Sequence, residues 1–267
     1  MKEFQKAQSL LSEPFGFALI DGIVTGFEDY EKLENYAMKA PEKSSRGSLL
    51  RVPLESIAKA MRLSRPLYEK NLKQKHKEQF QKKLQDIEKG FSPHEQDVVD
   101  FMIRGLRFPK ETLRVPIILV AFAPHPGGLT VRSSNNGAVC IIGMSQFSGS
   151  TFYEAIVHES IHAFDATFAS SDNALSMLRE MLLRNGVGRE DAIYRNLPHT
   201  LMFVHSAEAI RKYVNRKHRP YGETSGYYSK MGKISELVET HWQEYLKKGD
   251  NLETTLQLVV EKALKNT

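Results

Sequence analysis

The chain has 267 residues, of which 41% are hydrophobic and 26% charged, a composition typical of a globular protein and too apolar for a disordered one. Its net charge of +5 comes from 37 Lys and Arg residues against 32 Asp and Glu residues, and this small excess argues against nucleic-acid binding. The single cysteine, Cys140, excludes an intramolecular disulfide and argues against a thiolate zinc site.

The residues up to about 110 show apolar side chains spaced three and four apart, which predicts a helical N-terminal region, residues 1–110. Within it, residues 70–89 carry the densest basic charge, but their lysines alternate with glutamine and glutamate, so we interpret them as a solvated helix face. Ser92 and Glu95 indicate the start of the last helix of this region. The expected helices cover residues 29–40, 53–63, 65–90 and 92–106.

No apolar run approaches the length of about 18 to 20 residues that a membrane helix needs. The first 26 residues make a poor signal peptide, because Pro14, Gly16 and Asp21 interrupt their apolar stretch. We therefore expect no membrane span and a cytoplasmic location by default, although signal-independent export would leave the same sequence.

Two continuous apolar runs, residues 113–123 and 135–144, predict two buried strands. The segment PHPGGLTVRSSNNG between them is rich in turn residues. Four further helices are expected beyond residue 170, over residues 173–186, 199–217, 234–249 and 251–266. The fold class predicted from this pattern is α+β, mostly helical, with a small β-sheet beside the helix described next.

The segment TFYEAIVHESIHAFDATF, residues 151–168, reads as an amphipathic helix that Thr151 and Glu154 start as a capping box. His158 and His162 are four residues apart and therefore project from one helix face, where both imidazoles can bind one Zn²⁺ ion. Glu159 lies beside that face without being a ligand, and it is the candidate general base that takes a proton from the attacking water.

A catalytic zinc site needs a third protein ligand. The helix does not continue to a glycine turn and a third histidine, because Asp165 and Phe168 occupy those positions. The remaining candidates are Asp165, His199, His205 and Glu208.

Glu208 is the preferred third ligand, because its small neighbours Ser206 and Ala207 would let a carboxylate approach the metal closely. His205, one turn earlier, is its main rival for this role. Asp165 is better suited to contact a ligand imidazole or to be a charge on the helix face.

The H-E-S-I-H helix followed by a distant glutamate-bearing helix resembles the gluzincin branch of zinc metallopeptidases. Residues 196–214, 218–228 and 241–249 are similar to a group of poorly characterised bacterial H-E-x-x-H proteins, and the similarity covers about residues 150–260. It implies a zincin-like metallopeptidase domain over residues 111–267, Zn²⁺ as the cofactor, and a peptide or protein as the substrate. The 46 residues from His162 to Glu208 exceed the usual gluzincin spacing.

Peptide hydrolysis also needs a donor for the oxyanion. Tyr221 is the first choice, because Pro220 stiffens its backbone and Gly222 leaves space beside it. The same loop also offers His218, Arg219, Tyr227 and Tyr228.

The leading hypothesis is a zinc-dependent metallopeptidase that hydrolyses peptide bonds with a Glu-activated water. One alternative keeps the metal but acts on a non-peptide amide. The other is a non-catalytic helical binding module that docks an acidic partner through residues 70–89.

Overall fold

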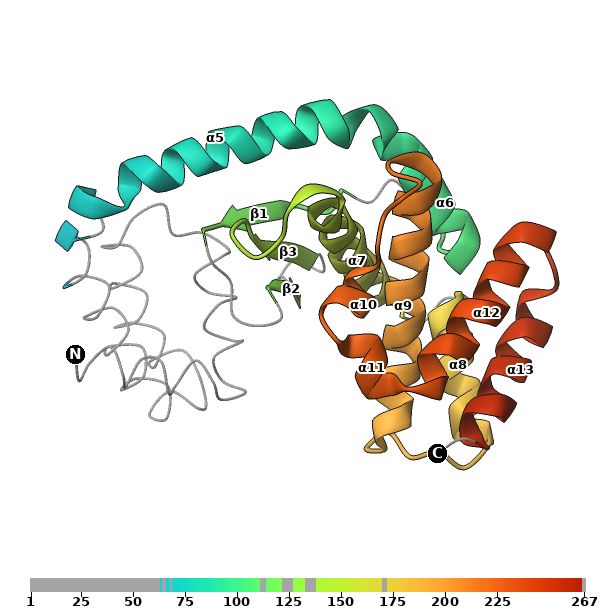
Figure 1. Cartoon of the computed structure of the whole chain (residues 1–267). Helices are drawn as coiled ribbons and strands as arrows, with labels where there is room; N and C mark the ends of the chain where they lie inside the picture. The colour runs from blue at the N-terminus through green and yellow to red at the C-terminus, as the bar shows by residue number, and fades with distance from the viewer. Residues whose placement is uncertain are drawn as a thin grey trace. The chain divides into compact units, whose positions relative to one another are not determined.

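The computed structural model describes residues 63, 66–67, 69–110, 114–121, 127–132, 138–169 and 172–265 (Figure 1). The chain divides into two compact units, Met1–Gln81 with Val131–Asn135, and Lys82–Thr130 with Asn136–Thr267. The helices expected over residues 29–40 and 53–63 lie outside the described residues, apart from Leu63.

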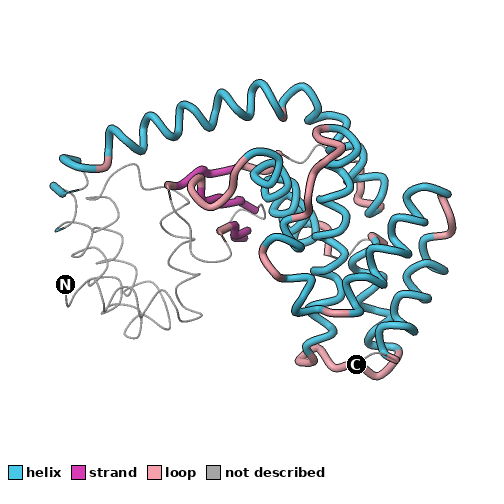
Figure 2. The backbone as a smooth tube through the Cα atoms, in the orientation of Figure 1, coloured by secondary structure: helices cyan, strands magenta, loops and turns pink. Residues whose placement is uncertain are grey.

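The described part of the chain is mostly helical with one small sheet, which confirms the predicted α+β class (Figure 2). None of its helices is long and apolar enough to cross a membrane. The helices are α5 (Lys73–Gly90), the 3₁₀ helix η1 (Ser92–His94), α6 (Glu95–Leu106), α7 (Gly149–Thr167), α8 (Ala174–Arg184), α9 (Ala192–Tyr213), α10 (Tyr221–Thr224), α11 (Tyr227–Met231), α12 (Lys233–Lys248) and α13 (Leu252–Leu264).

The sheet has the strand order β1-β3-β2, formed by β1 (Ile117–Val120), β2 (Gly128–Arg132) and β3 (Ala138–Gly143). β1 runs parallel to β3 with Ile117 opposite Cys140, so both predicted strands are confirmed. β2 was not predicted, because it is short, begins at a glycine and lies in a segment rich in turn residues. This missed strand lies on the other side of β3 from β1.

The capping box expected at Thr151 and Glu154 is wrong, because α7 has Ser148 as its N-cap and receives no side-chain capping hydrogen bond. The helix expected to start at Ser92 does begin there, as η1, which continues into α6. The carboxylate of Glu154 accepts a hydrogen bond from a backbone N–H outside α7, that of Tyr221.

α7 and α9 form the centre of the second unit. α7 packs against both β3 and α9, while α6, α8 and α12 pack on α9, as Figure 1 shows. α13 packs against α8 and α12. α6 therefore belongs with the C-terminal helices, although its residues fall in the region that the sequence analysis assigned to the N-terminal part. The largest fully buried side chains include Trp242, Phe152, Met102 and Leu178.

His205 of α9 is part of this core. Its ring is fully buried, stacks on Phe101 with the centroids 4.9 Å apart, and accepts a hydrogen bond from Trp242 Nε1 at its Nδ1, 3.0 Å away. Gly105 of α6 lies against the same ring, where an added Cβ would stand 2.4 Å from Cε1 of His205. His205 therefore joins α6 and α12 to α9, and burial lowers its pKa to about 3.

We expect Gly105→Ala to destabilise the protein by about 1 to 3 kcal/mol, because the added methyl group overlaps a ring that has no room to move. A Gly→Ala change inside a helix usually has the opposite effect and raises the free energy of unfolding by roughly 0.5 to 1 kcal/mol. Urea unfolding measures it. In a His205→Ala background the same change should cost nothing, and an equal cost in both backgrounds would contradict the assigned contact.

The free energy of unfolding should fall as the pH is lowered from about 6.5 towards 3, because His205 takes up a proton in the unfolded chain but not in the folded one. Its contribution is about 1.4 kcal/mol per pH unit in this window. In His205→Gln, which retains an acceptor for Trp242, the slope measured by urea unfolding with a chelator present should be smaller by that amount. Equal slopes in the two proteins would refute the assignment.

Candidate metal centre

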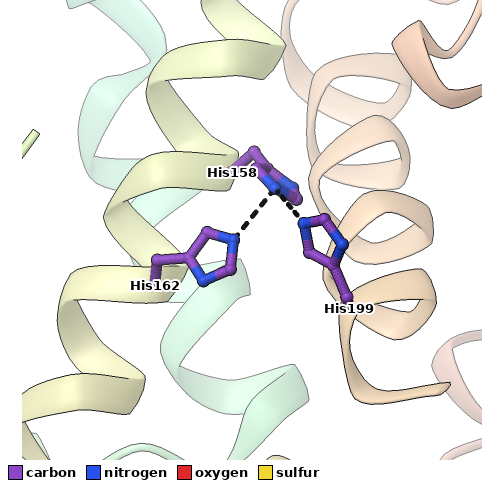
Figure 3. A group of neighbouring side chains, drawn as sticks. All are labelled: His158, His162 and His199. Carbon is purple, nitrogen blue, oxygen red and sulfur yellow. Dashed lines mark hydrogen bonds between the residues drawn. The ribbon is translucent and has the colours of Figure 1, made fainter. Parts of the chain in front are cut away.

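α7 presents two histidines on one face, as the four-residue spacing predicts. His158 is buried and His162 is half-buried, and their Nε2 atoms lie 3.2 Å apart (Figure 3). The amphipathic pattern of the helix turns this face towards α9 and leaves the apolar residues Ile161 and Phe164 in the core.

α9 contributes a third histidine, His199, to the same point. Its Nε2 lies 3.1 Å from Nε2 of His158, and ligand atoms of all three residues lie within 4.8 Å of one another (Figure 3). Two ligands of a tetrahedral zinc ion with bonds of about 2.0 to 2.1 Å lie roughly 3.3 Å apart. The three histidines could therefore hold a metal ion.

The three imidazoles are held in the neutral form that binds metals. Burial lowers the pKa of His162 to about 4, with a further contribution from the nearby Arg179 guanidinium. Burial, followed by the proximity of His162, lowers the pKa of His199 to about 4. The pKa of the fully buried His158 is also lowered, first by burial and then by the other two histidines. A neutral imidazole has only one N–H, so three converging ring nitrogens cannot all be satisfied by one another, whereas a cation satisfies their lone pairs.

Aromatic side chains enclose this cluster. Phe203, one turn after His199 on α9, stacks on His158 with ring centroids 4.1 Å apart and an angle of 29° between the ring planes. Tyr227 of α11 contacts His199 edge-on at 5.4 Å. These contacts restrict the rotation of both imidazoles and reduce the access of water to them.

Glu159 follows His158 on α7, and its carboxylate faces β2. The hydroxyl of Thr130 lies 2.7 Å from Oε2 of Glu159 and 2.9 Å from its backbone oxygen. Gly128 leaves room for the carboxylate, since a Cβ there would stand 2.6 Å from Oε1. Burial raises the pKa of Glu159 to about 7. The missed strand β2 thus positions the predicted general base.

Glu208 does not join the three histidines. Its Oε1 accepts hydrogen bonds from Arg211 Nη1 at 2.6 Å and from Gln243 Nε2 at 3.0 Å. His199, which the sequence analysis counted among the candidates without preferring it, takes its place in the cluster. The small residues beside Glu208 accommodate helix packing, and nothing in the sequence distinguishes this packing from approach to a metal.

The two other candidates for the third ligand also have structural partners. Asp165 forms a bidentate pair with Arg179 of α8, with oxygen–nitrogen distances of 2.6 and 2.7 Å. His205 binds Trp242 in the core. Neither belongs to the histidine group.

Tyr221, the predicted oxyanion donor, is connected to the histidine cluster through the ring of Phe203. Its ring is 6.3 Å from that of Phe203, which also contacts His158, and 5.0 Å from that of Phe147. The ring of Tyr227 contacts His199 directly, but its hydroxyl donates to the backbone oxygen of Asn196, 3.3 Å away. The role of Tyr221 stays a prediction.

No protein-family model matches the chain, and no curated protein or solved structure is significantly similar to it. The chemistry of the site is therefore inferred from its own residues. Three neutral imidazoles on two packed helices would, around a tetrahedral ion, leave one position open to water or substrate.

We expect His199→Ala to weaken metal binding by more than about 100-fold, because it removes one of three ligands. Glu208→Gln is the matched comparison and should leave the affinity within about threefold of the wild type, since Glu208 pairs with Arg211. Competition with a chromophoric chelator measures both. The reverse ranking would restore Glu208 as the third ligand.

Proposed function

We propose that this protein is a zinc-dependent metallopeptidase. The observation that carries the proposal is that His158, His162 and His199 converge while the carboxylate of Glu159, the next residue after His158, is separately held by Thr130. Imidazole ligands suit zinc, and a set of three protein ligands is typical of catalytic rather than structural zinc sites.

A bound zinc ion would lower the pKa of a coordinated water and polarise a substrate carbonyl. Glu159 then accepts a proton from the attacking water and returns it to the leaving amine. Thr130 restrains one carboxylate oxygen of Glu159, which leaves the other to take part in proton transfer. Tyr221 is proposed as a donor to the developing oxyanion, since its ring lies in the aromatic group around Phe203.

Peptides are the proposed substrate class, in line with the resemblance of the H-E-x-x-H helix to metallopeptidases. The same residues would also hydrolyse a non-peptide amide, since the leaving group is an amine in both reactions. The cleavage assay separates these alternatives, because an enzyme for small amides leaves long peptides intact.

Glu159→Gln should lower peptide cleavage by about 10² to 10⁴-fold while zinc content and thermal stability stay near those of the wild type, because only the proton acceptor is lost. Mass spectrometry of a peptide library incubated with zinc-loaded protein measures cleavage. Glu208→Gln, a carboxylate change outside the cluster, is the control that should remain active. Full activity in Glu159→Gln, or equal activity with and without a chelator, would refute the proposal.

A further inference from the structure

Four polar residues form a stripe along one face of α7. Ser150, Glu154, His158 and His162 are spaced by four, so each lies about one helical turn from the next. The two histidines are candidate metal ligands, and the capping role expected for Glu154 is absent. Glu154 is only 1% exposed, and burying a carboxylate is costly unless both of its oxygens are hydrogen-bonded or paired.

Two atoms of this stripe are buried without a hydrogen-bond partner: Oε1 of Glu154 and Nδ1 of His158. Among the described residues only His205 Nε2 shares this condition. Oε1 of Glu154 is a hydrogen-bond acceptor, whereas Nδ1 of His158 belongs to a neutral ring that carries its proton on one of its two nitrogens. Glu154 and His158 themselves lie one turn apart on the same helix face, a spacing at which Cβ atoms are about 5 to 6 Å apart.

The arrangement of the metal cluster determines which nitrogen of His158 carries that proton. Nε2 of His158 faces His162 and His199, so it is the nitrogen that would bind the ion (Figure 3). The ring proton must then be on Nδ1, which becomes a buried donor in need of an acceptor. Histidines that bind metals usually donate this second N–H to a carboxylate or carbonyl oxygen.

The other oxygen of Glu154, Oε2, has two hydrogen-bond partners. Oε2 accepts hydrogen bonds from His218 Nε2 at 2.6 Å and from the backbone N–H of Tyr221 at 2.7 Å. His218 is itself fixed by Ser150, whose Oγ lies 2.8 Å from its Nδ1, and Asn215 donates to that Oγ at 3.2 Å. These bonds anchor the carboxylate and leave Oε1 without a partner in this network.

We propose that Glu154 is a positioning residue of the metal centre, whose Oε1 accepts the Nδ1 proton of His158 when the ion is bound. This inference rests on the proposed metal site. The bond orients the imidazole and makes it a better ligand. It also links the metal to His218 and Tyr221, so that the segment leading into α10 is attached to the same carboxylate that supports a ligand.

The test compares the zinc affinities of the wild type, Glu154→Gln and His218→Gln by competition with a chromophoric chelator. Glu154→Gln has nearly the same shape but is a weaker acceptor, and should bind zinc about 10 to 100-fold less tightly. His218→Gln removes one of the two bonds to Oε2 but keeps the carboxylate and its bond to Tyr221 N–H, and should lower the affinity by a smaller factor than Glu154→Gln does. A purely structural Glu154 would instead lower the two affinities equally, and that result would overturn the inference.

A second measurement needs no variant. In zinc-loaded wild-type protein, long-range ¹H–¹⁵N spectra should show His158 with a protonated Nδ1 that exchanges slowly with water. Rapid exchange of that proton, or coordination through Nδ1, would overturn the inference. If the wild-type protein binds no zinc, the metal site itself is refuted. If the wild type binds zinc and Glu154→Gln binds it equally tightly, only the role of Glu154 is refuted.

Discussion

The packing of α7 against α9 is the contact on which the rest of the site depends. Each helix brings side chains at four-residue spacing to the shared interface, His158 and His162 from α7 and His199 and Phe203 from α9. Neither helix alone carries three ligands at one point. The candidate metal centre is therefore part of the core of the second unit, and anything that shifts one helix along the other separates the ligands.

The three histidines are buried or half-buried in a neutral form, in contact with aromatic side chains. Neutral imidazoles are less costly to bury than charged ones, and their low pKa values follow from the scarcity of water around them. Phe203 and Tyr227 supply the aromatic contacts. Because the three histidines converge only in the folded chain, metal binding would stabilise the fold of this region.

Charged residues near the site are paired, either with a residue of a neighbouring helix or with one of their own helix. Asp165 pairs with Arg179, and Glu208 pairs with Arg211. His205 is likewise hydrogen-bonded to Trp242. Three of the four candidates for the third ligand therefore have partners that stabilise the fold. Glu154 differs from the paired carboxylates Asp165 and Glu208, because one of its oxygens is buried without a partner in the described structure.

The sequence by itself determined the local features: the helix of residues 151–168, the common face of His158 and His162, and the two apolar strands around residues 113–123 and 135–144. These follow from periodicity and spacing within one segment, which short-range geometry controls. It also showed the mostly helical α+β class.

Only the tertiary structure shows that His199, and not Glu208, lies beside His158 and His162, because both residues are on α9 and their positions depend on which face of that helix turns towards α7. The partners of Glu154 also came from the structure, since His218 and Tyr221 are more than 60 residues away in the chain. β2 was missed for a related reason: a short strand that begins at a glycine has little periodicity of its own, and its pairing with β3 is what makes it a strand. Contacts between distant segments arise from tertiary packing, so they cannot be predicted from the pattern of any single segment.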